Sequence, residues 1–75
     1  MAPSAEPVAD TVTYAGGTLK CRGFRLDGAM HGAWSWYRTD GSLMRSGQFE
    51  RGRQVGTWRT FDREGNVVRE TPFPD

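Results

Sequence analysis

A 24-residue pattern occurs twice in this 75-residue chain, in residues 23–46 and again in residues 47–70. Six positions are identical between the copies: Gly23/Gly47, Gly28/Gly52, Gly32/Gly56, Trp34/Trp58, Gly41/Gly65 and Arg45/Arg69. A fixed period of this length is typical of a repeat protein, in which one supersecondary unit stacks on its own copies. A weaker match at Gly17, Leu19 and Gly23 extends the pattern upstream, so we predict a partial unit over residues 14–22.

Turn signals divide the chain into short segments about a dozen residues apart. Asp-Gly at 27–28 and at 40–41 favours hairpin turns, because glycine adopts positive φ without steric cost. The segments between turns contain aromatic and branched residues and no proline, which is typical of strands: 19–26, 30–38, 42–49, 54–61 and 67–71. No window sustains the apolar spacing of a helix. The sequence therefore predicts an all-β fold, an antiparallel hairpin meander of about five strands built from 24-residue units.

The repeated tryptophans are predicted to be structural. Glycine and tryptophan at fixed spacing indicate that each ring lies across a neighbouring strand where a glycine leaves room. The predicted structural residues are the two tryptophans, the aromatic residue three positions after each tryptophan and two glycines of each unit: Trp34, Trp58, Tyr37, Phe61, Gly28, Gly32, Gly52 and Gly56. Trp36 has Thr60 at the matching position, so the repeat does not require it, and both a structural and an interface role are open.

The two ends of the chain are predicted to lie outside the repeat. Residues 1–13 are interpreted as a flexible leader, since they have neither the basic start of a signal peptide nor an apolar run. Residues 72–75 are interpreted as a tail, with Pro72 and Pro74 ending the last strand. The single cysteine, Cys21, excludes an intrachain disulfide and fits a reducing, cytoplasmic compartment, although a secreted protein without disulfides has the same composition.

Two segments share the pattern Gly-x-x-x-Gly-x-Trp-x-x-Tyr/Phe: residues 28–37 and residues 52–61. On these residues the chain resembles the MORN-repeat proteins, most closely the bacterial variant form, over residues 14–70. Arg25 departs from the pattern, because it stands where an aromatic residue is expected. The resemblance implies a repeat domain over residues 14–71 that is a non-enzymatic hairpin array. Members are linked to membrane-associated scaffolding or protein–protein contact, and some bacterial members are labelled antitoxins.

The residues themselves predict no enzyme, cofactor or metal site, because no nucleophile, nucleotide-binding or metal-spacing motif occurs. His31 is the only histidine, and Asp40 and Glu64 precede turn glycines, which explains both as turn residues. The expected function is binding of another protein, in an antitoxin-like or immunity-like role, with Trp36 and Phe49 as anchors. A homodimer formed by edge-strand or face pairing is included in this expectation.

The arginines of the second unit suggest an alternative function. Residues 14–70 hold all ten basic residues and six acidic ones, a formal charge of +4. Arg51, Arg53 and Arg59 lie close in sequence to aromatic residues, a combination that binds phosphates or stacks on bases. Acidic residues such as Glu50 and Asp62 are interspersed with these arginines and compensate much of their charge. A phospholipid or nucleic-acid surface is therefore the less favoured partner.

Overall fold

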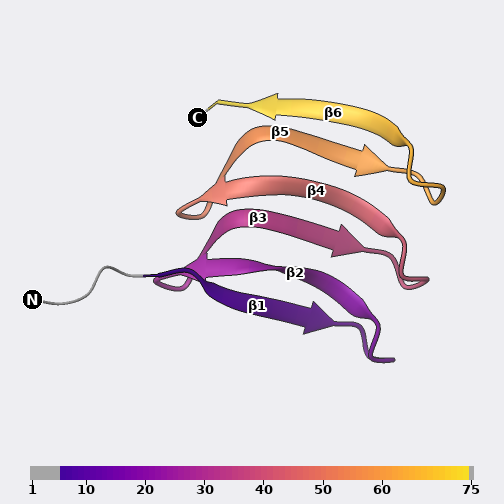
Figure 1. Cartoon of the computed structure of the whole chain (residues 1–75), viewed down its shortest axis with the longest axis horizontal. Coiled ribbons are helices and arrows are strands. Elements are labelled where there is room, and N and C mark those ends of the chain that lie inside the picture. The colour runs from indigo at the N-terminus through magenta and orange to yellow at the C-terminus, as the bar shows by residue number, and fades with distance from the viewer. Residues whose placement is uncertain (1–5, 75) are drawn as a thin grey trace, which may run out of the picture.

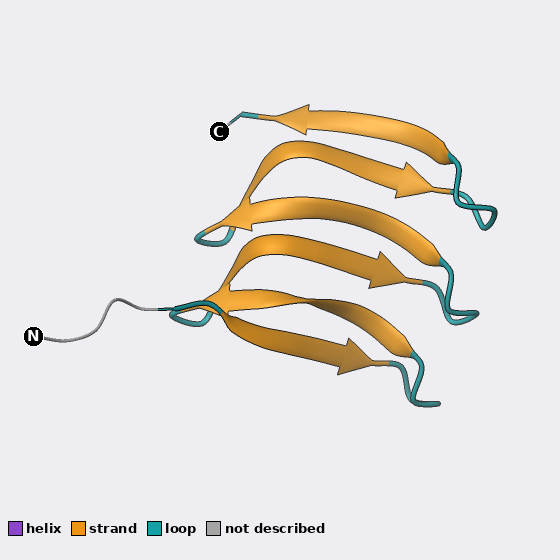
Figure 2. Cartoon of the chain, viewed as in Figure 1, coloured by secondary structure: helices purple, strands orange, loops and turns teal. Residues whose placement is uncertain are grey.

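In the computed structural model, which describes residues 6–74, the chain forms one antiparallel sheet of six strands in chain order (Figure 1). The strands are Val8–Thr13 (β1), Leu19–Leu26 (β2), Ala29–Tyr37 (β3), Leu43–Glu50 (β4), Arg53–Phe61 (β5) and Val67–Phe73 (β6). Figure 2 shows strands joined only by loops. The predicted all-β hairpin meander is therefore confirmed. No helix in residues 6–74 has the length and apolar character that crossing a membrane requires.

Both edges of the sheet differ from the prediction. Val8–Thr13 form a strand that pairs with β2, so the predicted flexible leader is wrong for these residues. The prediction for residues 1–5 lies outside the described residues. β6 continues through Pro72 to Phe73, so the predicted tail begins too early. An edge strand tolerates proline because one row of its backbone donors has no neighbouring strand to bind.

Three loops at the same end of the sheet share one backbone geometry. In each loop the first residue donates its N–H to the carbonyl of the fifth, and the fourth donates to the carbonyl of the first. The loops are residues 14–18, 38–42 and 62–66, and the fourth residue of each is a glycine with φ of 89° to 94°. Only glycine adopts this φ without strain. The loops begin 24 residues apart, so the spacing of the sequence pattern recurs in the backbone.

Side chains connect the first two of these loops to the end of a following strand. The Tyr14 hydroxyl donates to the carbonyl of Tyr37 at 2.7 Å, and the Arg38 guanidinium donates to the carbonyl of Phe61. The two acceptors are the last residues of β3 and β5. Tyr37 and Phe61 were predicted to be structural residues, and their carbonyls accept these bonds at the loop end of the sheet.

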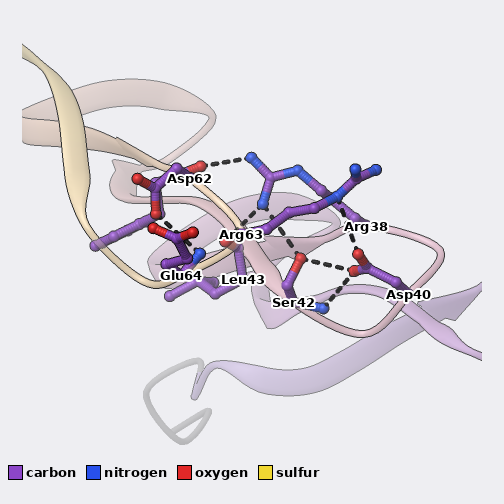
Figure 3. Close-up of polar contacts among 8 residues, drawn as sticks. Arg38, Asp40, Ser42, Leu43, Asp62, Arg63 and Glu64 are labelled. Carbon is purple, nitrogen blue, oxygen red and sulfur yellow. Dashed lines mark hydrogen bonds and ion pairs between the residues drawn. The ribbon is translucent and has the colours of Figure 1, made fainter.

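Two aspartates hold their loops in place with their carboxylates. The Asp62 carboxylate accepts N–H donors from Glu64 and Asn66, each at 2.9 Å, and the backbone bond from Asn66 contributes most to lowering the pKa of Asp62. The Asp40 carboxylate accepts the Ser42 hydroxyl at 2.7 Å and the Ser42 N–H at 2.9 Å (Figure 3). Both bonds lower the pKa of Asp40, and the bond from the Ser42 hydroxyl contributes most. Both carboxyl groups are therefore turn acceptors, a role that the sequence position of Asp40 predicts and that was not predicted for Asp62.

The lowered pKa of Asp62 predicts a pH-dependent contribution to stability. A folded-state pKa below the unfolded value of about 3.9 stabilises the fold above that pH, and the contribution is lost as the pH falls through the folded-state pKa. We expect Asp62→Asn to lower the melting temperature at pH 7 and to lower it less near pH 2, because protonation of the wild-type carboxyl reduces this contribution as the pH falls. Thermal unfolding at both pH values measures this, and an equal difference at the two pH values would contradict it.

Candidate functional site

The two repeated tryptophans lie over glycines of neighbouring strands. Trp34 of β3 covers Gly23 of β2, and Trp58 of β5 covers Gly47 of β4. A Cβ placed on Gly23 would lie 2.1 Å from the Trp34 indole, and one on Gly47 would lie 2.0 Å from the Trp58 indole. The indoles are the most buried side chains described, with 1% and 3% of their surface exposed. Each ring therefore lies where a neighbouring strand lacks a side chain, as the sequence pattern predicts.

Five rings join into one cluster, which we call the aromatic cluster: Trp34, Trp36, Phe49, Trp58 and Phe73. The Trp36 ring lies between the two buried indoles, with centroid distances of 5.9 Å to Trp34 and 5.3 Å to Trp58. Phe49 meets Trp58 edge-on at 5.1 Å, and Phe73 meets Trp58 edge-on at 6.1 Å. Edge-on and tilted arrangements are the favourable geometries for aromatic pairs. Trp36, Phe49 and Phe73 are half-buried, so they form the outer surface of the cluster.

The two buried indoles differ in their hydrogen bonds. Trp34 Nε1 donates to the carbonyl of Phe24 at 2.9 Å. Trp58 Nε1 is also buried, but no acceptor for it occurs within residues 6–74. A buried donor without an acceptor costs about 1–3 kcal/mol. Trp58 is therefore held by the packing of its ring and not by its polar atom.

Arginine side chains continue the aromatic cluster. Arg25, which stands where the pattern calls for an aromatic residue, places its guanidinium 5.5 Å from the centroid of Trp34 and pairs with Asp10 at 2.8 Å. The Arg45 guanidinium lies 4.6 Å from the centroid of Trp58 and 5.9 Å from that of Trp36. Guanidinium groups within about 6 Å of a ring are attracted to its face. Arg25 thus substitutes for the missing ring at that end of the cluster.

The arginines predicted as an anionic-surface site do not come together. Arg51 lies in the β4–β5 turn, with φ of 50°, while Arg53 begins β5 and Arg59 lies six positions further along that strand. At about 3.3 Å per residue, Arg53 and Arg59 are roughly 20 Å apart. Arg59 also pairs with Glu70 at 2.8 Å. These three arginines therefore do not form a single basic patch.

The structure instead places two other arginines beside the aromatic cluster. Arg45 of β4 is in register with Thr60 of β5, and Thr60 is in register with Arg69 of β6. A cleft of about 240 Å³ is lined by Arg45, Trp58, Thr60, Arg69 and Thr71. The Arg45/Arg69 identity is visible in the sequence, but no role was predicted for these two arginines. The signal was the 24-residue separation, which places equivalent residues on alternate strands of a meander, on the same face.

The remaining polar candidates have structural explanations. His31 accepts the Arg51 N–H through Nδ1 at 3.1 Å, so it supports the β4–β5 turn. Among the described residues, no group of three or more His, Cys, Asp or Glu side chains is placed to hold a metal ion. The sheet face that carries the aromatic cluster is thus the candidate functional site.

Comparisons with known proteins do not assign this site. No protein-family model matches the chain, no curated protein matches its sequence, and no solved structure matches its fold. The chemistry of the aromatic cluster and its arginines is therefore the basis for a functional proposal.

Proposed function

We propose that this chain is a non-enzymatic module that binds another protein through the outer surface of the aromatic cluster. The observation that carries the proposal is the single-layer sheet: within residues 6–74 no second layer covers the half-buried rings of Trp36, Phe49 and Phe73. An apolar sheet face is normally buried against another layer of structure. Tryptophan, phenylalanine and arginine, which form this face, are also the residues enriched in protein interfaces.

The MORN-like character of the repeat belongs to the same proposal. Supporting it are the Gly-x-x-x-Gly-x-Trp pattern and the repetition of the loops and of the tryptophan–glycine contacts. An antitoxin-like or immunity-like role in the cytoplasm is one form of protein binding that this surface would serve. The anionic-surface alternative has less support, because Arg51, Arg53 and Arg59 are separated and Arg59 is paired.

A second copy of the chain is one partner that the sheet edges favour. Four of the five exposed large apolar residues lie on the edge strands: Val8 and Val12 on β1, and Val67 and Val68 on β6. Edge strands present unpaired backbone groups, and another strand can pair with them. Pro72 removes one backbone donor from β6, whereas β1 contains no proline, so β1 is the better edge for pairing.

The proposed function is tested by comparing Trp36→Ala with Phe24→Ala. Phe24 is 42% exposed and is not part of the aromatic cluster, so its replacement controls for removing a ring from elsewhere on the sheet. We expect Trp36→Ala to stay folded and to lose more than about tenfold in partner affinity, as is usual when an interface anchor is truncated. Phe24→Ala should bind like the wild type.

The measurement is quantitative pull-down from lysate at moderate and at high salt, with circular dichroism to verify folding. Binding anchored by rings should survive high salt, whereas binding to phosphate groups should not. Light scattering on the same samples reports whether the partner is a second copy. Equal capture by the wild type and by Trp36→Ala would contradict the proposal.

A further inference from the structure

On the sheet face that carries the aromatic cluster, which we call the aromatic face, one cross-strand row of residues is apolar toward β1 and cationic toward β6. The row runs in register through six strands: Val12, Cys21, Trp36, Arg45, Thr60 and Arg69. Its first half is apolar, with Val12 exposed, Cys21 buried and the Trp36 ring half-buried. Its second half has a threonine, Thr60, with one arginine on each side, Arg45 and Arg69. The row therefore offers an apolar surface and a cationic surface side by side.

The two arginines of this row have no anionic partner in the described structure. Ion pairs engage Arg25, Arg59 and Arg63, and the Arg38 guanidinium donates to Ser42 Oγ and to backbone carbonyls. Within residues 6–74, Arg45 and Arg69 make no ion pair and no side-chain hydrogen bond, so their donors are available to a ligand.

The arrangement is also suited in shape to a single oxyanion. Neighbouring strands lie about 4.8 Å apart, so the backbones of Arg45 and Arg69 are roughly 10 Å apart, with Thr60 between them. Arg45 is positioned by its contact with the Trp58 ring at 4.6 Å. Thr60 and Thr71 add hydroxyl donors to the lining of the cleft. Guanidinium groups bind carboxylate and phosphate oxygens with paired hydrogen bonds.

We propose that the Arg45–Arg69 cleft binds a carboxylate of the protein partner, next to an apolar side chain that lies on Trp36. This inference rests on the proposed function and specifies the chemistry of the partner segment, an acidic residue beside a hydrophobic one. A carboxylate fits better than a phosphate chain because the row holds only two unpaired cations and its other half is apolar. Binding to a polyanion requires many neutralised phosphates.

The test is a nuclear magnetic resonance titration of the labelled full-length chain with two matched peptides, acetyl-Leu-Ser-Glu-amide and acetyl-Leu-Ser-Gln-amide. Leucine and glutamate two positions apart lie on the same side of an extended peptide. We expect the glutamate peptide to bind about tenfold more tightly and to shift the side-chain signals of Arg45, Arg69 and Trp36. Charge-assisted hydrogen bonds to arginine account for a preference of this size.

Variants assign the preference to the two arginines. Arg45→Gln and Arg69→Gln should each abolish the preference for the glutamate peptide, whereas Arg53→Gln, which removes an exposed arginine elsewhere, should keep it. Arg45 also packs on Trp58, so Arg69→Gln, which alters an exposed edge-strand residue, provides the decisive variant if Arg45→Gln does not fold.

Three results would overturn the inference. Equal binding of the two peptides with a shift at Trp36 would exclude the carboxylate site and leave the aromatic face as a binding surface. No binding of the glutamate peptide at about 10 mM would exclude the site even if the pull-down finds a partner. Inorganic phosphate, oligothymidylate or phosphatidylserine vesicles that shift the Arg45 and Arg69 signals at lower concentration than the peptide would assign the cleft to phosphate groups instead.

Discussion

Replacing Gly47 by alanine is expected to lower the free energy of unfolding by about 3 kcal/mol or more, at the upper end of the usual cost of overpacking. The added methyl group would lie 2.0 Å from the Trp58 ring, well inside the contact distance, and the ring is too buried to move aside. In a domain of this size such a loss lowers the melting temperature by roughly 12–24 °C. Thermal unfolding followed by circular dichroism measures it.

Two further glycine variants complete this test. Gly23→Ala should behave like Gly47→Ala, because its Cβ would meet the Trp34 ring at 2.1 Å. Gly16→Ala is the matched control, since its φ is not positive and no atom of residues 6–74 lies within 4 Å of the added carbon. Its effect should stay within about 0.5 kcal/mol, as for most surface substitutions. Equal melting temperatures for Gly47→Ala and Gly16→Ala would exclude the ring-over-glycine contact.

Replacing Trp58 by alanine is expected to cost about 3–5 kcal/mol, as is typical for removing a buried aromatic ring. Trp58 contacts Trp36, Phe49 and Phe73, so its loss opens the cluster from β3 to β6. Small proteins have only about 5–15 kcal/mol of stability in total, and a single-layer sheet has little other apolar burial to draw on. We therefore expect Trp58→Ala to be largely unfolded at room temperature.

The comparison variant is Trp36→Thr, which copies the residue at the equivalent position 60 of the second unit. Trp36 is only half-buried, so this variant should lose less stability and remain folded. Urea unfolding of both proteins by tryptophan fluorescence and circular dichroism gives the two free energies. If Trp36→Thr and Trp58→Ala lose equal stability, the division between a structural ring and a binding ring is wrong.

The sequence predicted the middle of the sheet better than its edges, because the terminal units lack the residues that define the repeat. In β1 the position equivalent to Trp34 is Asp10, 24 residues earlier, so this strand lacks the tryptophan that identifies the repeat. In β6 the position equivalent to Gly47 is Thr71, 24 residues later. Its side chain fills the space that the ring of a further tryptophan would occupy. Atypical end units are common in repeat proteins, where they terminate the stack. A pattern search keyed to glycine and tryptophan therefore finds the central strands and misses β1.

The candidate site was predicted in part, for a reason that lies in the meander itself. Trp36 and Phe49 were singled out, and both lie in the aromatic cluster. Arg53 and Arg59 are close in sequence but lie far apart along one strand, whereas Arg45 and Arg69 are 24 residues apart and flank the same threonine. In such a sheet the repeat period determines which side chains are neighbours across strands, and proximity in sequence does not.

The most direct test of the account is the chemical shift of the glycine α-protons in solution. The contact of each indole with its glycine places one α-proton of Gly23 and one of Gly47 against the face of a tryptophan ring, where the ring current shifts the signal strongly upfield. We expect both signals to lie well upfield of ordinary glycine values. Ordinary shifts for both glycines in the wild type, like that of Gly16, would contradict the account.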